Sequence, residues 1–126
     1  MEEESKKVLL VDDDDFIREM YTTALESAGI EVITAKNGKD GADLAIKHHP
    51  SVILLDIEMP IMNGHEAAEK IRLDGWGKTA RILFLTNHSD PTNVVTAVSQ
   101  KPEDFIVKAN ISVKEVVNQV RIAMFG

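Results

Sequence analysis

Short runs of branched apolar residues recur along the chain, separated by longer stretches in which apolar residues return every three or four positions. The runs are strand-sized, and most are continuous rather than alternating, which is typical of parallel strands covered on both faces. They lie at Val8–Val11, Glu31–Thr34, Val52–Leu55, Ile82–Leu85 and Phe105–Val107. We therefore expect five largely buried strands.

The stretches between the runs have the spacing of amphipathic helices. The first places Ile17, Tyr21 and Leu25 on one face, and Gly29 follows at a position typical of a helix C-terminus. Further helices are expected after Asn37, after Gly64, after Pro91 and from Ser112, and residues 74–79 are expected to form a loop. The pattern thus alternates strand and helix five times.

This alternation predicts an α/β fold, a doubly wound five-stranded parallel sheet with right-handed crossovers and five helices. A length of 126 residues fits a single domain. We expect the domain at residues 8–126, preceded by a solvated tail at residues 1–7.

Composition excludes several classes of function. The chain has no cysteine, which rules out disulfides, a thiol nucleophile and a thiolate zinc site. Its longest apolar runs reach four residues, whereas a membrane span needs about 20, so we expect no membrane segment. The start, MEEESKK, lacks the profile of a secretory signal, and we expect a cytoplasmic protein.

The net charge of −7 is unevenly distributed. Residues 1–58 hold 14 acidic and six basic side chains, and residues 59–126 hold seven acidic and eight basic ones. Neither half has the basic stripe that binds phosphate backbones, so we expect no direct contact with nucleic acid.

Polar residues follow four of the expected strands. Asp12 and Asp13 come after the first, Asp56 after the third, Thr86 after the fourth and Lys108 after the fifth. The carboxyl ends of parallel strands lie at one edge of the sheet, where ligands of such folds bind. We therefore expect these five side chains to converge on one small site.

The convergence indicates a particular chemistry. Ionised carboxylates about 4 Å apart repel by roughly 4 kcal/mol per pair at an effective dielectric constant near 20, so the cluster calls for a cation, and Mg²⁺ prefers such oxygen ligands. Lys108 offers a positive charge for an anionic group, and Thr86 offers a hydroxyl. The combination is typical of phosphoryl transfer onto an aspartate.

Four segments together resemble a known family. They are KVLLVDD at 7–13, VILLDIEMPIMNG at 52–64, ILFLTN at 82–87 and DFIVK at 104–108. With these segments in this order, the chain resembles a response-regulator receiver domain of two-component signalling, the CheY-like family. The resemblance implies a flavodoxin-like strand order, 2-1-3-4-5.

The resemblance also implies roles for individual residues. Asp56 would be both the phosphoacceptor and a Mg²⁺ ligand. Asp13 would be a direct Mg²⁺ ligand and Asp12 a ligand through water, while Glu58 would lend the metal its backbone carbonyl. Thr86 would be the switch hydroxyl that contacts the phosphoryl group.

Two further roles come from the same resemblance. Lys108 would bind the phosphate, and Phe105 would be the aromatic residue that changes rotamer on activation.

The function implied is a phosphorylation-activated switch rather than an enzyme with an external substrate. Its phosphodonor would be a sensor histidine kinase or a histidine phosphotransfer protein. We expect a downstream protein partner to bind the fourth helix, fifth strand and fifth helix, because residues 91–126 carry only three acidic and four basic side chains.

Two alternatives stay open. Asn87 and Ala109 depart from the family's usual residues beside Thr86 and Lys108, so the domain could be an interaction module that works without phosphate. A Mg²⁺-dependent phosphatase with an aspartyl-phosphate intermediate is the other, although Glu58 stands where such enzymes are expected to carry a second Asp.

Overall fold

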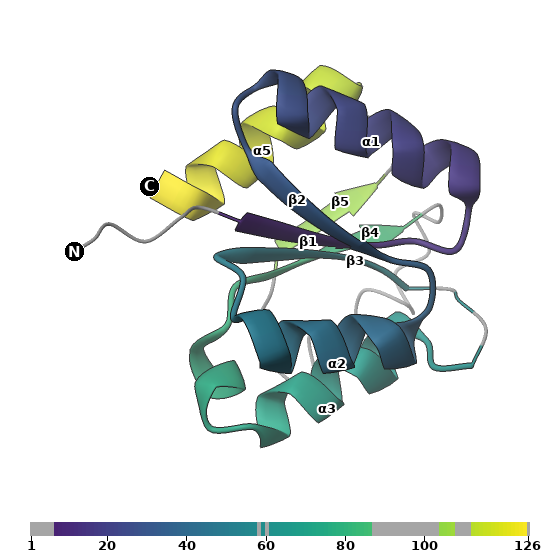
Figure 1. Ribbon diagram of the computed structural model, residues 1–126, viewed down its shortest axis with the longest axis vertical. Coiled ribbons are helices and arrows are strands. Elements are labelled where there is room, and N and C mark those ends of the chain that lie inside the picture. Colours follow the sequence, from purple (N-terminus) through teal and green to yellow (C-terminus); the bar gives the residue numbers. More distant parts are fainter. Residues whose placement is uncertain (1–6, 58, 60, 87–103, 108–111, 126) are drawn as a thin grey trace.

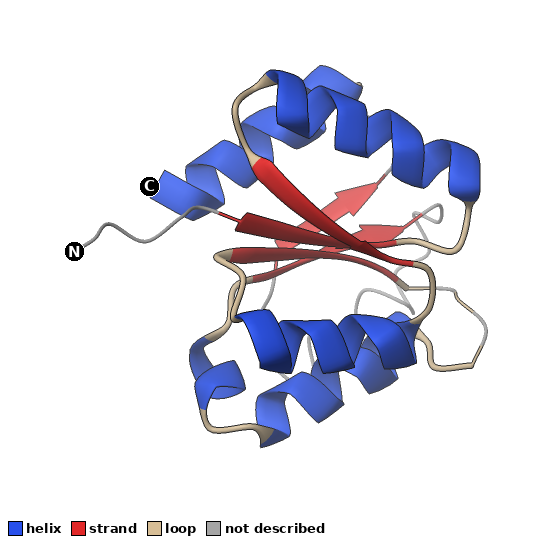
Figure 2. Ribbon diagram, in the orientation of Figure 1, coloured by secondary structure: helices blue, strands red, loops and turns tan. Residues whose placement is uncertain are grey.

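The computed structural model describes residues 7–57, 59, 61–86, 104–107 and 112–125. Its centre is a five-stranded parallel sheet with the order β2-β1-β3-β4-β5. Figures 1 and 2 show the sheet between two layers of helices. The strands are β1 (Lys7–Val11), β2 (Glu31–Ala35), β3 (Val52–Asp56), β4 (Ile82–Thr86) and β5 (Asp104–Val107).

Four α-helices and one short 3₁₀ helix occur in the described ranges. They are α1 (Asp15–Ser27), α2 (Gly38–His48), α3 (Gly64–Leu73), the 3₁₀ helix η1 (Trp76–Thr79) and α5 (Val113–Phe125). The helix expected after Pro91 lies outside the described residues, so the prediction of five helices stays untested.

The α/β fold with a parallel sheet is confirmed, and the strand bounds agree with the sequence pattern to within one residue at each end. β1 begins at Lys7, one residue before the expected start, because Lys7 pairs with Glu31 and its carbonyl accepts the Ser51 N–H at 2.9 Å.

Alternate residues of the strands supply two separate cores. Helices α1 and α5 cover one face of the sheet, and α2 and α3 cover the other (Figure 1). The α1/α5 side buries Val8, Leu10, Tyr21, Leu25, Ile30, Val52, Leu54, Leu83, Leu85, Val116, Val120 and Met124. The α2/α3 side is led by Leu9, Val11, Ile53, Leu55, Ile71, Ile82 and Phe84. Apolar residues on both faces explain why the strands read as continuous runs.

Local signals set the ends of α1. The Asp14 side chain accepts the Ile17 N–H at 3.0 Å and caps the N-terminus. At the other end Gly29 adopts φ 85°, and the Ile30 N–H donates to the Leu25 carbonyl at 3.1 Å. The glycine predicted to end this helix therefore does so, in a Schellman motif.

One expectation was wrong. Residues 74–79 were expected to form a loop, but Trp76–Thr79 forms η1. Arg72 holds this turn by donating to the Gly77 carbonyl at 2.8 Å and to the Ala80 carbonyl at 2.7 Å. These side-chain bonds reach backbone atoms five and eight residues away and do not change the spacing of hydrophobic residues. The hydrophobic pattern therefore could not predict the turn.

Within the described ranges, no helix has the length and apolar character needed to cross a bilayer.

Candidate functional site

Three carboxylates meet at the carboxyl edge of the sheet. Oxygen atoms of Asp12, Asp13 and Asp56 all lie within 4.8 Å of one another. Asp12 and Asp13 follow β1 directly, and Asp56 ends β3, the strand that pairs with β1. The predicted convergence of these three residues is therefore present in the fold.

Burial makes this cluster electrostatically costly. Asp12 is fully buried and Asp56 is 4% exposed, whereas Asp13 is exposed. At such separations, ionised carboxylates repel by about 3–4 kcal/mol per pair at an effective dielectric constant near 20. An all-oxygen set of this kind fits a hard divalent cation such as Mg²⁺, which would offset the repulsion.

The loop from β3 to α3 packs closely behind Asp56. The Gly64 N–H donates to the Ile57 carbonyl at 2.8 Å, and a Cβ atom at Gly64 would lie 2.3 Å from the Asp56 carbonyl oxygen. Only glycine allows this approach. The first turn of α3 is further fixed by a capping box between Asn63 and Glu66.

The same loop carries a strained residue. Ile61 has φ 72° and is 76% exposed, although a β-branched side chain disfavours positive φ. Such strain is often kept at functional sites, and here it lies five residues after Asp56.

Arg18 joins the site without having been predicted. Its guanidinium donates to the Asp12 carbonyl at 2.8 Å and also bonds the Asp15 carboxylate. The three-residue spacing between Asp15 and Arg18 on a helix could have indicated the ion pair, but not the bond to Asp12.

The remaining predicted residues are only partly described. Thr86 ends β4 and Phe105 lies in β5, and the described part of each is its backbone. β4 pairs directly with β3, and Asp56 is opposite Leu85. Thr86 is the residue after Leu85, so it lies one position beyond the partner of Asp56. Glu58 and Lys108 lie outside the described residues.

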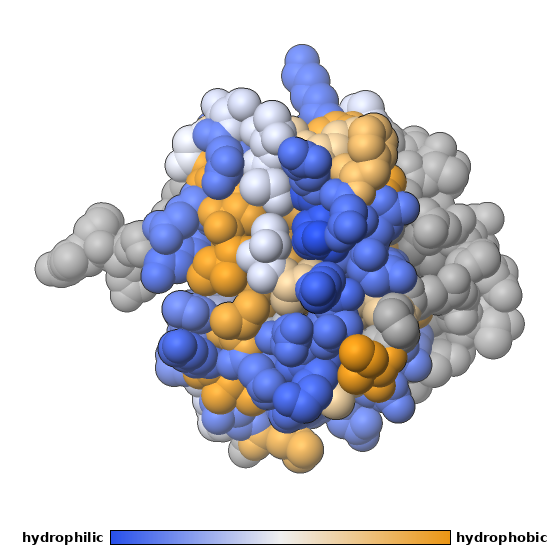
Figure 3. Space-filling model, turned by 45° about the vertical axis from the view of Figure 1, so that its right-hand side comes forward, coloured by the Kyte–Doolittle hydropathy of each residue, from blue (hydrophilic) through white to orange (hydrophobic). Residues whose placement is uncertain are grey.

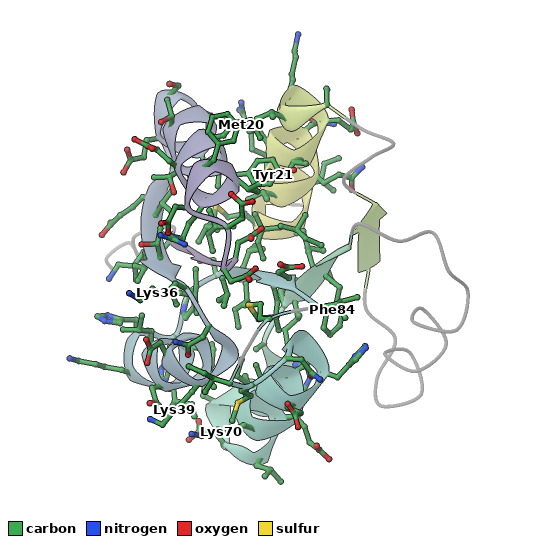
Figure 4. All side chains as sticks on the ribbon, turned by 90° about the vertical axis from the view of Figure 1, so that its right-hand side faces the viewer. Met20, Tyr21, Lys36, Lys39, Lys70 and Phe84 are labelled. Atoms are coloured by element: carbon green, nitrogen blue, oxygen red, sulfur yellow. The ribbon has the colours of Figure 1, made fainter. Side chains whose placement is uncertain are left out.

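The surface on the side turned toward the carboxyl edge is mixed in character. In Figure 3 hydrophilic residues cover much of the centre of the view, and hydrophobic ones form a band on its left and separate patches at the upper right and lower right. Figure 4 looks directly at this edge: α1, with Met20 and Tyr21, lies above the sheet, and Lys39 and Lys70 project from the helices below it.

The sequence matches the response regulator receiver domain over residues 8–121. The chain belongs to this family. Curated relatives of this receiver domain include the transcriptional regulatory protein SrrA of Staphylococcus aureus, 36% identical over 117 residues, which are 93% of this chain and 47% of SrrA. The probable transcriptional regulator ycf27 of Porphyra purpurea is 32% identical over 121 residues, 96% of this chain and 48% of ycf27. The chain spans about half the length of these relatives.

Solved receiver domains have the same fold. The chemotaxis protein CheY4 of Vibrio cholerae superposes with a TM-score of 0.87 at 30% identity, covering 95% of this chain and 99% of CheY4. The receiver domain of a sensor histidine kinase from Pseudomonas aeruginosa, solved with a magnesium ion in its active-site cleft, gives a TM-score of 0.88. At 20% identity, covering 98% of this chain and all of that one, it shows the fold alone.

Proposed function

We propose that this receiver domain is a phosphorylation-activated switch in which Asp56 accepts a phosphoryl group from a phosphohistidine. The observation that carries the proposal is the meeting of Asp12, Asp13 and Asp56 at one edge of the sheet, with oxygen atoms within 4.8 Å. Membership of the receiver family supports it.

The reaction needs one nucleophile and a way to offset charge. A carboxylate oxygen of Asp56 forms a bond to phosphorus while the bond from phosphorus to the donor imidazole nitrogen breaks. The products are an acyl phosphate on Asp56 and a neutral histidine that has taken up a proton. Catalysis then consists mostly of positioning and of neutralising the transferred group.

The acidic residues divide this work. Mg²⁺, when bound, would neutralise the carboxylates and the phosphoryl oxygens. Asp13 and Asp56 would hold it, with Asp12 assisting through water, and the Glu58 carbonyl would complete the protein ligands. Thr86 and Lys108 would contact the phosphoryl oxygens. The roles assigned to these individual residues follow from the family motif.

We propose a sensor histidine kinase or a histidine phosphotransfer protein as donor. A downstream protein would bind the face formed by the fourth helix, β5 and α5. The chain would assist its own phosphorylation and dephosphorylation, without turnover of another substrate, and would act in the cytoplasm.

Intact mass after incubation with Mg²⁺ and acetyl phosphate tests the nucleophile. The native chain should gain one phosphoryl group, and Asp56→Asn should gain none, because the nearly isosteric amide cannot act as the nucleophile. Asp14→Asn is the matched control, since Asp14 caps α1 and Asn also caps well. A phosphorylated Asp56→Asn chain would refute the assignment.

The same samples separate the two alternatives. Steady release of product from a small phosphate ester would indicate a phosphatase. Absence of any mass increase in the native chain would favour an interaction module that works without phosphate.

A further inference from the structure

Arg18, in the first turn of α1, folds back over the loop that joins β1 to α1. Its Nη1 donates to the Asp12 carbonyl oxygen at 2.8 Å, and its Nη2 donates to Oδ1 of Asp15. One guanidinium thus contacts both ends of the loop that carries Asp13.

The bond to the carbonyl controls more than Asp12. A carbonyl and the N–H of the next residue belong to one rigid peptide plane, so Arg18 fixes the plane between Asp12 and Asp13. Asp12 is held at two further points: its N–H donates to the Ala35 carbonyl at 3.2 Å, and its Oδ1 accepts the Asp14 N–H at 3.0 Å. The Asp13 N–H lies in the same plane, so the orientation of this plane constrains the backbone from which the exposed Asp13 side chain extends.

An exposed ion pair does not account for the arrangement. The Asp15 side chain is 87% exposed, and pairs of that kind contribute little, whereas the Arg18 side chain is 19% exposed. Arg18 also forms part of the wall of a hollow of about 420 Å³ with Lys36 and Leu44. Lys36 follows β2 on the left of Figure 4. The hollow leaves room for other side chains at position 18.

We propose that Arg18 is a positioning residue of the acidic site: it holds the peptide between Asp12 and Asp13 so that both carboxylates face one cation. This inference rests on the proposed function for the identity of the cation. It concerns a residue that bonds the Asp12 carbonyl and the Asp15 carboxylate and is not itself among the proposed metal or phosphate ligands.

Charge and positioning predict opposite effects on metal affinity. If Arg18 acted only as a nearby positive charge, its removal would strengthen Mg²⁺ binding. If it positions the loop, removal weakens binding. Lysine keeps the charge but lacks the planar fork that reaches the carbonyl and Asp15 together.

The experiment measures Mg²⁺ affinity by calorimetry for the native chain, Arg18→Met and Arg18→Lys. We expect the dissociation constant to rise about tenfold in both variants, as for other residues that orient metal ligands. Binding by Arg18→Met that is equal to or tighter than native would overturn the proposal, and so would full rescue by lysine.

Arg72→Met is the matched control. Arg72 also donates to two backbone carbonyls, those of Gly77 and Ala80, but at the far end of α3, about 12 Å along the helix from Gly64. This variant should lower the melting temperature and leave Mg²⁺ affinity unchanged. An equal loss of Mg²⁺ affinity in Arg72→Met and Arg18→Met would show that general destabilisation causes the loss. That result would overturn the proposal.

A readout without metal tests the positioning role of Arg18 separately from the proposed function. Hydrogen exchange of the Asp14 amide, which bonds Asp12, should accelerate in Arg18→Met but not in Arg72→Met. An unchanged rate would refute the positioning role. If the native chain bound no Mg²⁺, the proposed function would fail, and this rate would still decide the role of Arg18.

Discussion

At the scale of single residues, His65 is in an unfavourable environment. Both ring nitrogens are buried with no hydrogen-bond partner among the described residues, and the ring lies against Phe84 at 5.8 Å between centroids. Burial lowers the pKa of His65 from its ordinary 6.5, because the charged imidazolium loses solvation.

We therefore predict that His65→Leu stabilises the domain, by about 1 kcal/mol near pH 8, since leucine removes unpaired polar atoms at similar volume. Below pH 6.5 the unfolded histidine takes up a proton before the native one, so native stability falls as pH decreases. The difference in the free energy of unfolding between His65→Leu and the native chain, measured by urea unfolding, should therefore increase from pH 7 to pH 5. Parallel curves over that range would contradict this reading.

Gly64 and Gly75 give a second contrast between residues. A Cβ at Gly64 would meet backbone atoms of Asp56 and Ile57 at 2.3 and 2.8 Å, whereas at Gly75 no atom of the described residues lies within 4 Å. We expect Gly64→Ala to lower the free energy of unfolding by about 2 kcal/mol or more. Gly75→Ala, with φ −55° and ψ −45°, should be neutral or slightly stabilising. Similar losses in both variants would contradict the close packing behind Asp56.

At the scale of elements, Asp43 links the two helices on one face of the sheet. Its carboxylate accepts from Lys39 of α2 at 3.2 Å and from Lys70 of α3 at 3.1 Å. These bonds, that from Lys70 first, hold the pKa of Asp43 below its ordinary 3.8. A carboxyl with a lowered native pKa stabilises the fold above the unfolded value and loses that contribution as pH falls through the native value.

We expect Asp43→Asn to cost less than about 1 kcal/mol at pH 7, because the carboxylate is half exposed and screened by solvent. A double-mutant cycle with Lys70→Met should give a coupling energy that disappears in about 1 M salt and also as the pH falls through the native pKa of Asp43, which lies below 3.8. Coupling that survived both conditions would mean that the two helices interact by packing rather than charge.

Element types and several helix ends could be predicted because their causes are local. Asp14 and Gly29 are typical cap residues, and they cap α1. The turn at η1 could not be predicted, because Arg72 stabilises it by hydrogen bonds to backbone carbonyls. Every residue has a backbone carbonyl, so the sequence does not indicate which one is bonded. The bond from Arg18 to the Asp12 carbonyl escaped prediction for the same reason.

At the scale of the whole molecule, the parallel sheet predicts which side chains meet. All carboxyl ends share one edge, so Asp12, Asp13 and Asp56 could be placed together from sequence alone. The sequence pattern cannot predict how individual groups are oriented. The peptide plane between Asp12 and Asp13 is an example. The positions of Glu58 and Lys108 stay predictions.

Metal binding should change the stability of the entire domain. A ligand that binds only the native state stabilises it by mass action, by about 2.7 kcal/mol at 100 times the dissociation constant. We expect saturating Mg²⁺ to raise the melting temperature by several degrees and Asp13→Ala to abolish the rise. Asp14→Ala, which removes the α1 cap, should melt lower yet keep the response. An undiminished response in Asp13→Ala would place the metal elsewhere.

The stacking of Trp76 on His49, with ring centroids 4.5 Å apart and planes 10° from parallel, has a spectroscopic consequence. Trp76 is the chain's single tryptophan, so all indole emission comes from η1, at the amino edge of the sheet. The axis of α3, about 15 Å long, separates it from Gly64 and Asp56. Intrinsic fluorescence should therefore follow urea unfolding while staying constant in a Mg²⁺ titration. A change of emission on adding metal would show that the edge remote from Asp56 responds to events at the acidic cluster.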